Sequence, residues 1–152
     1  MLELRDIIAR HPVFADIAPE RARLLAGCAR NHHFPPGSWL LREGGAADEF
    51  YLIRHGRVAL DIHAPGRAPL TIATLGDGDL LGASWLVPPY RWQFDARALE
   101  DTRAIGIDAA CLRAKADADP GFGYDMMKRF VPLLVRRLQA TRLQLLDVYA
   151  AP

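Results

Sequence analysis

Residues 78–94, GDLLGASWLVPPYRWQF, combine residue types that could hold an anionic ligand. Gly82 and the residues after it could form the first turn of a helix, where backbone N–H groups attract negative charge. Arg91 adds a cation within the same stretch. The stretch is therefore either a loop that binds an anion or a hydrophobic turn of similar composition.

Four of the thirteen aromatic residues of the chain lie in this stretch: Trp85, Tyr90, Trp92 and Phe94. They form either a plug that fills a cavity or a wall on which a different ligand stacks. Aromatic residues at this density favour packing, so the plug is the preferred interpretation. Arg91 is a candidate ligand for a phosphate or a carboxylate, and the alternative is a surface arginine stacked on Tyr90 or Trp92.

Histidine, cysteine and acidic residues elsewhere give no pattern of a metal site. His32 and His33 are adjacent, so on a strand their side chains would point to opposite faces. Cys28 and Cys111 lack the spacing of a zinc site, and each is predicted to be a buried, reduced thiol. The remaining histidines, His11, His55 and His63, are assigned structural or surface roles. The turn acids Glu43, Asp48 and Glu49 are predicted to be solvated.

The sequence also lacks the local motifs of common enzymes, because no G-x-S-x-G, Walker loop or Cys-His arrangement is present. We predict no catalytic residue and no enzymatic activity. The net charge of +1 gives no global electrostatic reason for binding nucleic acid. No apolar run reaches the roughly 20 residues of a membrane span, and the charged N-terminus is unlike a signal peptide. A cytoplasmic protein with no membrane association is therefore predicted.

The 152 residues fit one domain, with a helical start, a strand-rich middle and a helical end. Residues 1–31 contain predicted helices over 2–10 and 19–30, the second with Pro19 at its first position. Residues 32–108 contain short β-rich runs between turns rich in Pro and Gly, which predicts a sandwich, barrel or jelly roll. The predicted strands cover residues 32–34, 38–42, 49–54, 57–63, 70–75, 92–99 and 102–107.

Residues 109–150 return to a helical pattern, with a short helix after Asp108 and a long one over 121–150. Pro132 is predicted to kink or divide the long helix near 128–132. From Phe130 onward, apolar residues recur at spacings of four and three and form a stripe on one face. This stripe either packs on the same domain or pairs residues 132–148 with a second copy, as in a coiled coil. The predicted homodimer residues are Leu134, Leu138, Thr141, Leu145 and Val148.

This order of elements, together with three motifs, resembles the cyclic-nucleotide-binding domain of the catabolite-activator-protein (Crp/Fnr-like) superfamily. The motifs are FPPGSWLLREGGAADEFYLIRHGRVAL (34–60), LGDGDLLG (75–82) and DARALEDTRAIGID (95–108). The resemblance implies a mainly-β fold, in which an eight-stranded β-roll or jelly roll is flanked by N-terminal helices and a long C-terminal helix. The resemblance extends from about residue 10 to 148, nearly the whole chain, and residues 1–152 are predicted to form a single domain.

The resemblance further implies a phosphate-binding segment at 82–92, made of a glycine, a short helix and an arginine. Gly82 matches the glycine, and Ser84 and Trp85 fall in the short helix, so backbone donors at 83–85 could still face an anion. Ala83, however, stands at the position of a glutamate that accepts a hydrogen bond from the ribose. Losing such a bond costs about 1.5–3 kcal/mol. Trp92 stands at the arginine position, and Arg91 lies one residue earlier.

The predicted function is a stand-alone sensory or regulatory domain with an altered phosphate-binding segment, so that binding of cAMP or cGMP is weak or lost. A cyclic nucleotide or another small anion is the candidate ligand. One alternative is a dimeric interaction module that binds a protein partner and no small molecule. Another is the N-terminal part of a Crp/Fnr-type transcription regulator. The helix-turn-helix of such regulators follows this domain and the sequence ends at Pro152, so no DNA binding by this chain alone is expected.

Overall fold

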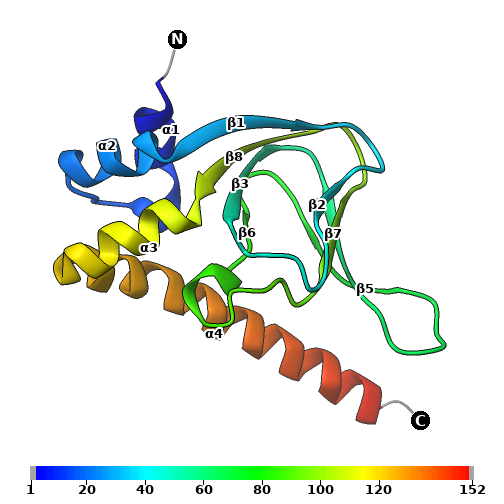
Figure 1. The fold of residues 1–152 in the computed structure, drawn as a ribbon. Coiled ribbons are helices and arrows are strands. Elements are labelled where there is room, and N and C mark those ends of the chain that lie inside the picture. The colour runs from blue at the N-terminus through cyan, green and yellow to red at the C-terminus, as the bar shows by residue number, and fades with distance from the viewer. Residues whose placement is uncertain (1–2, 151–152) are drawn as a thin grey trace. The chain divides into compact units, whose positions relative to one another are not determined.

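A computed structural model describes residues 3–150, in which eight strands form two antiparallel four-stranded sheets, with helices before and after them (Figure 1). The predicted mainly-β roll with flanking helices is confirmed. One sheet has the order β1 (Ala29–Phe34), β8 (Thr102–Asp108), β3 (Glu49–His55) and β6 (Leu80–Leu81). The other has the order β2 (Trp39–Leu41), β7 (Asp95–Ala98), β4 (Val58–Ile62) and β5 (Leu70–Leu75).

The central strands β3 and β4 are apolar on both faces. Phe50 to Ile53 on β3 and Val58 to Leu60 on β4 are all buried. A strand with only one buried face would alternate apolar and polar residues, so these runs indicate strands that are covered on both sides. They form the core of the roll. They also pair with β6 and β7, the strands on either side of residues 82–94.

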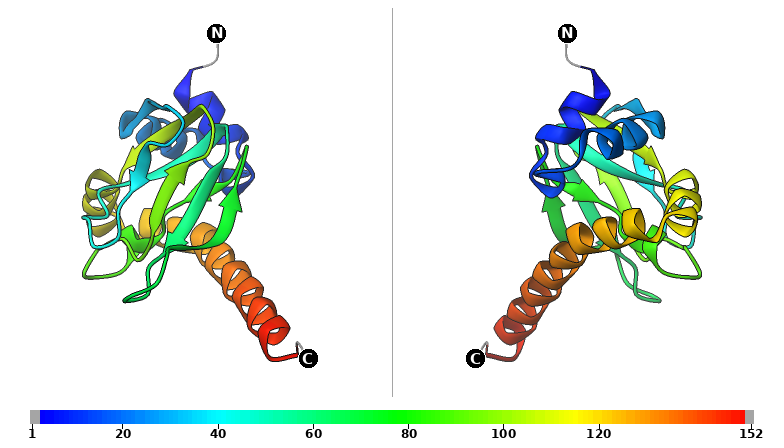
Figure 2. Two further views of the ribbon diagram at one scale, coloured as in Figure 1. Left: turned by 90° about the vertical axis from the view of Figure 1, so that its right-hand side faces the viewer. Right: turned by 90° about the vertical axis from the view of Figure 1, so that its left-hand side faces the viewer.

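Three short helices precede the strands: α1 (Leu4–Arg10), the 3₁₀ helix η1 (Pro12–Phe14) and α2 (Pro19–Gly27). Figures 1 and 2 show α1 and α2 together beside β1, and Ile8, Phe14 and Leu25 are buried there. The second helix ends three residues before the predicted boundary, because the chain enters β1 at Ala29. Residue 2, where the first helix was predicted to begin, lies outside the described residues.

The chain divides into two compact units, residues 1–114 and residues 115–152. The second unit contains the end of α3 (Ala109–Ala118) and the long helix α4 (Pro120–Ala150). The prediction that Pro132 divides this helix is wrong, since α4 continues through it. Proline removes one backbone hydrogen bond, and the bonds on either side maintain the helix. Phe122, Met126 and Phe130 are buried, whereas the apolar residues after them are largely exposed.

Cys28 and Cys111 form a disulfide, so the prediction of two reduced thiols is wrong. The two residues are 83 positions apart in the sequence, and the fold brings their Cα atoms to 6.2 Å. That separation lies within the usual range for a disulfide. No local spacing could have indicated the pair, because only the path of the whole roll brings the two residues together.

Candidate functional site

The segment from Gly82 to Trp92 connects β6 to β7 through a short helix, as the family resemblance implies. After Gly82 the chain forms the 3₁₀ helix η2 (Ser84–Leu86), for which Ala83 is the N-terminal flanking residue. Strand β6 is only two residues long and was missed by the sequence analysis, since two residues show no periodicity. Strand β7 begins at Asp95 instead of residue 92, so Arg91 and Trp92 both precede it.

Trp92 fills the space directly beside Gly82. A methyl group placed on Gly82 would lie 2.7 Å from each of two carbon atoms of the Trp92 ring, Cη2 and Cζ3. The Trp92 side chain is buried, and its backbone pairs with the loop before β3. Its N–H donates to the Gly45 carbonyl at 2.9 Å, and its carbonyl accepts from the Gly44 N–H at 2.9 Å. The backbone therefore fixes the indole against Gly82, where only a glycine leaves room for it.

A second indole extends this aromatic cluster. The Trp85 ring stacks on Phe50, with ring centroids 5.0 Å apart and planes 12° from parallel. Trp85 is buried, and the Cβ atom of Phe50 also lies within 4 Å of the methyl position on Gly82. Tyr90 and Phe94 are only partly buried. Trp92 thus packs directly on Gly82, and Trp85 packs on Phe50 beside it.

The contacts of Arg91 are with the loop before β3 and not with this aromatic cluster. Its side chain is exposed and donates to the Gly44 carbonyl at 3.3 Å, and its backbone forms an isolated bridge with Ala46. A second arginine, Arg113 in the first half of α3, contacts the segment from another part of the chain. Its Nη1 donates to the carbonyls of Ala47 and Trp85 at 3.3 and 3.0 Å.

Arg113 also places its guanidinium over the ring of Tyr90, 4.3 Å from the centroid. Tyr90 has a φ of 56°, in the left-handed region. A planar guanidinium that stacks on an aromatic ring and donates to two carbonyls is well suited to hold a loop in one conformation. Arg113 was not among the predicted site residues, because an arginine within a helical pattern carries no signal of a contact with a distant loop.

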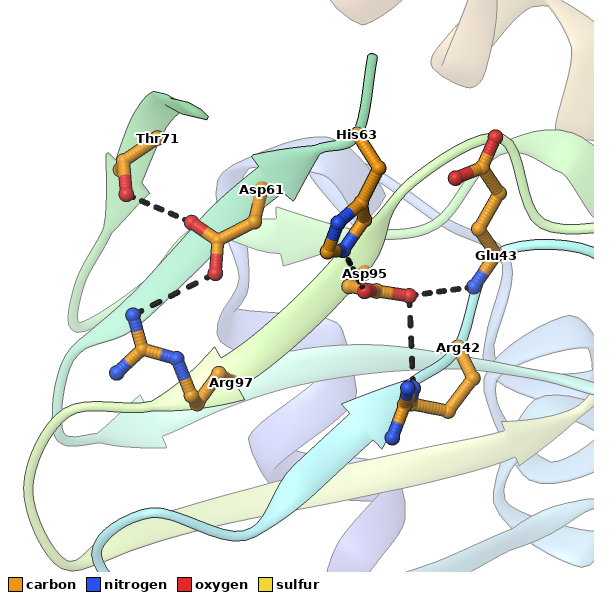
Figure 3. A network of polar contacts seen from close by, with 7 residues as sticks. All are labelled: Arg42, Glu43, Asp61, His63, Thr71, Asp95 and Arg97. Carbon is orange, nitrogen blue, oxygen red and sulfur yellow. Dashed lines mark hydrogen bonds and ion pairs between the residues drawn. The ribbon is translucent and has the colours of Figure 1, made fainter. Parts of the chain in front are cut away.

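A separate polar network covers part of the sheet that contains β2, β7, β4 and β5 (Figure 3). Ala96 and Ala98 are fully buried, so Asp95 projects from the opposite face of β7. The Asp95 carboxylate accepts hydrogen bonds from the Glu43 N–H at 2.7 Å and from His63 Nε2 at 2.6 Å. This pairing of His63 was not expected, since 32 residues separate the two side chains.

The network continues to Asp61, which is also buried. Asp61 accepts a hydrogen bond from the Thr71 hydroxyl at 2.6 Å and pairs with Arg97 at 3.4 Å. A hollow of about 390 Å³ lies at the Asp95 end, lined by Arg42, Glu43, His63 and Asp95. The two buried carboxylates are thus satisfied by neighbouring donors, as burial of charge requires.

The prediction that the turn acids are solvated is correct for Glu43 and Asp48, which are exposed, and wrong for Glu49. Glu49 is largely buried, with a side chain that is 20% exposed, and it contacts Arg30 and His32, each at 2.9 Å. Within residues 3–150, no group of three or more His, Cys, Asp or Glu side chains is arranged to hold a metal ion. In the same range, no helix has an apolar stretch long enough to cross a bilayer.

Asp95 should make the stability of the chain depend on pH. Burial alone would raise the pKa of Asp95, but the hydrogen bonds from Glu43 and His63 and the charge of Arg42 outweigh it and lower the pKa. A lowered pKa in the folded state stabilises the fold above the unfolded value of 3.8. This contribution is complete above about pH 5 and is lost as the pH falls through the folded pKa.

We therefore expect Asp95→Asn to lose about 1–3 kcal/mol of stability at pH 7, and less at acidic pH. Urea unfolding at a series of pH values from neutral to acidic measures both effects. Asp117→Asn, on an exposed part of α3, provides the matched control and should leave the pH profile unchanged. An equal loss for Asp95→Asn at every pH would contradict the assignment.

The predicted dimer residues lie on the exposed part of α4. Leu134, Leu138, Leu145 and Val148 are 38%, 51%, 57% and 74% exposed. Thr141 is exposed as well, and its hydroxyl donates to the Arg137 carbonyl one turn earlier. The structure thus places all five on an accessible surface of the second unit.

Comparison with known proteins places these features in a family. The sequence profile of the cyclic nucleotide-binding domain matches residues 31–119. A CRP-like cAMP-activated global transcriptional regulator of Mycobacterium tuberculosis is 25% identical over 143 residues, covering 94% of this chain and 62% of the regulator. The chain therefore spans less than two thirds of that curated relative.

Solved structures agree with this comparison. The catabolite activator protein of Thermus thermophilus superposes with a TM-score of 0.72 and 27% identity, over 91% of this chain and 63% of that one. A cyclic nucleotide-binding domain from Methylobacillus flagellatus has the same fold, with a TM-score of 0.78 and 24% identity over 95% of this chain and 81% of that one. Profile, relatives and fold agree: the chain belongs to the cyclic nucleotide-binding domain family.

Proposed function

We propose that this chain is a sensory or regulatory domain whose phosphate-binding segment has been altered, so that cAMP and cGMP bind weakly or not at all. The observation that carries the proposal is the Trp92 ring packed against Gly82. In the family resemblance, this is the position of the arginine that neutralises the cyclic phosphate. Here an indole with no charge occupies it, and the backbone bonds to Gly44 and Gly45 hold it there.

Two further residues support the proposal. Ala83 cannot accept a hydrogen bond from a ribose hydroxyl, because its side chain is a methyl group. Arg91 is exposed and donates to the Gly44 carbonyl. Each lost charge-assisted bond lowers affinity by about ten- to a hundredfold, so losing both contacts takes a typical micromolar site toward millimolar affinity or weaker.

Isothermal titration of the chain with cAMP and with cGMP tests this proposal. We expect no saturable binding at micromolar concentrations of either nucleotide. Micromolar binding of one of them would show that the segment still functions as in the family and would overturn the proposal. A thermal-shift screen of nucleotides and small anions then separates an altered ligand preference from a domain that binds no small molecule.

We also propose that the chain forms a homodimer through residues 132–148 of α4. Apolar side chains of this half of the helix are exposed within residues 3–150, including Leu138, Leu145 and Val148. A second copy would present the same stripe and bury it by coiled-coil packing. Such a dimer is compatible with a ligand-responsive regulator and with a dimeric interaction module that binds a protein partner.

Leu138→Glu should dissociate this dimer, because it places a charge in the middle of the apolar stripe. Light scattering at high micromolar concentration measures the result, and we expect the mass of one chain for the variant and of two for the wild type. Gln139→Glu adds the same charge to an exposed neighbouring position and should leave the dimer intact. A monomeric wild type would refute the proposal.

A further inference from the structure

The Cys28–Cys111 disulfide joins the end of α2 to the start of α3, the helix whose Arg113 contacts the candidate site. Cys28 directly follows α2, and Cys111 is the third residue of α3. The start of α3 is also held by two backbone hydrogen bonds. The Asp108 N–H donates to the Cys28 carbonyl, and the Ala109 N–H to the Asp48 carbonyl, both at 2.8 Å. Opening the disulfide would therefore loosen the start of α3 without detaching it.

A cavity lies beside the disulfide. Both cysteines line a cavity of about 780 Å³. Cys111 is partly exposed, and Cys28 is buried. Thiol–disulfide exchange requires a thiolate to reach one sulfur, so the cavity provides the access that a disulfide in a closed core lacks.

The charges around the cavity restrict which thiol reacts well. Asp48, Glu49 and Asp108 line it together with a single cation, Arg30, which is paired with Glu49. This excess of negative charge disfavours an anionic thiol and favours a neutral one. A neutral thiol reagent, such as a neutral dithiol, therefore fits the cavity better than an anionic one.

The first turns of α3 connect the disulfide to the candidate site. Arg113 lies two residues after Cys111 and donates to the carbonyls of Ala47 and Trp85. It also stacks on Tyr90. Arg113 therefore links the start of α3 to two points of the segment 82–92, the Trp85 carbonyl and the Tyr90 ring.

We propose that Cys28–Cys111 is a reversible thiol–disulfide exchange site, and that its state sets the order of the segment 82–92 through Arg113. A thiolate of the dithiol attacks one sulfur of the disulfide and forms a mixed disulfide, and the other cysteine leaves as a thiolate. The second thiol of the reagent then attacks the mixed disulfide, and the remaining cysteine leaves as a thiolate. The dithiol becomes a cyclic disulfide, and the protein gains two electrons and two protons as two thiols.

This inference does not depend on ligand binding, so it is tested on the chain alone. The folded protein is treated with dithiothreitol, free thiols are counted by alkylation and mass spectrometry, and amide hydrogen exchange is measured. We expect two thiols to form under native conditions. Exchange of residues 83–92 should rise about threefold or more, while exchange of residues 58–62 in β4 stays unchanged.

Two variants make the test specific. The double variant Cys28→Ser with Cys111→Ser should show the faster exchange of residues 83–92 with or without dithiothreitol. Arg113→Gln should show it while the disulfide is intact, and reduction should then add little. Arg103→Gln removes an exposed arginine from β8 and should behave as the wild type does.

Three results would overturn the proposal. Thiols that form only after denaturation would show that the disulfide is inaccessible. Faster exchange in β4 as well would show that the disulfide serves the whole fold. Reduction that leaves the exchange of residues 83–92 unchanged would show that the disulfide and the segment are not coupled.

Discussion

A chain carrying Trp92→Arg and Ala83→Glu should bind cAMP at least about a hundredfold more tightly than the wild type. The arginine removes the indole beside Gly82 and supplies a cation at the position that the family resemblance assigns to the phosphate ligand. The glutamate restores an acceptor for the ribose hydroxyl. Each charge-assisted hydrogen bond contributes about 1.5–3 kcal/mol, and about 1.4 kcal/mol corresponds to a tenfold change in affinity.

Isothermal titration measures this gain, and the matched control is Trp92→Gln with Ala83→Glu. Glutamine also opens the space beside Gly82 but carries no charge, so it separates removal of the indole from supply of the cation. We expect the control to bind at least tenfold more weakly than the arginine variant. Equal affinity of the folded arginine variant and the wild type would contradict the proposed reason for weak binding.

Gly82→Ala should destabilise the chain by about 3 kcal/mol. The added methyl group would lie 2.7 Å from two atoms of the Trp92 ring, which the backbone bonds to Gly44 and Gly45 prevent from moving freely. Overpacking of this kind costs about 1–3 kcal/mol. The φ of Gly82 is +95°, and a left-handed conformation costs an L residue about 1–2 kcal/mol more.

A double-mutant cycle separates the two contributions. In a Trp92→Leu background the ring is absent, so we expect Gly82→Ala to cost only about 1–2 kcal/mol from the backbone conformation. Gly66→Ala is the control for that conformation, because Gly66 has a φ of +73° and open space around its methyl position. Chemical unfolding measures all four proteins of the cycle. The same cost in both backgrounds would show that Trp92 does not pack on Gly82.

The sequence predicted the order of helices and strands because their signals are local. The apolar runs around Phe50 and Val58, and the helical spacing after Phe130, each depend on residues that are close in the chain. One wrong prediction and one missed strand remain at this level, and neither changes the class of fold. One proline at position 132 does not divide a helix that its neighbours maintain, and the two residues of β6 are too few to show a pattern.

The long-range contacts, within the candidate site and around it, were much less predictable from the sequence. Disulfide Cys28–Cys111, the His63–Asp95 pair and the contact of Arg113 with Trp85 each join residues that are 28 to 83 positions apart. Their partners follow from the three-dimensional path of the roll, which local patterns do not specify. The family resemblance did place Trp92 at the position of the phosphate-binding arginine, and in the structure this indole packs beside Gly82.

The indole beside Gly82 has a consequence for how this domain could change over evolutionary time. The tryptophan codon differs by one base from two of the arginine codons, and alanine and glutamate codons can also differ by one base. A segment with an indole beside Gly82 and one with a charged side chain there are therefore separated by very few mutations, while the glycine, the loop and the strands around them stay the same. Descendants of one such gene could gain or lose sensitivity to a nucleotide without rebuilding the fold.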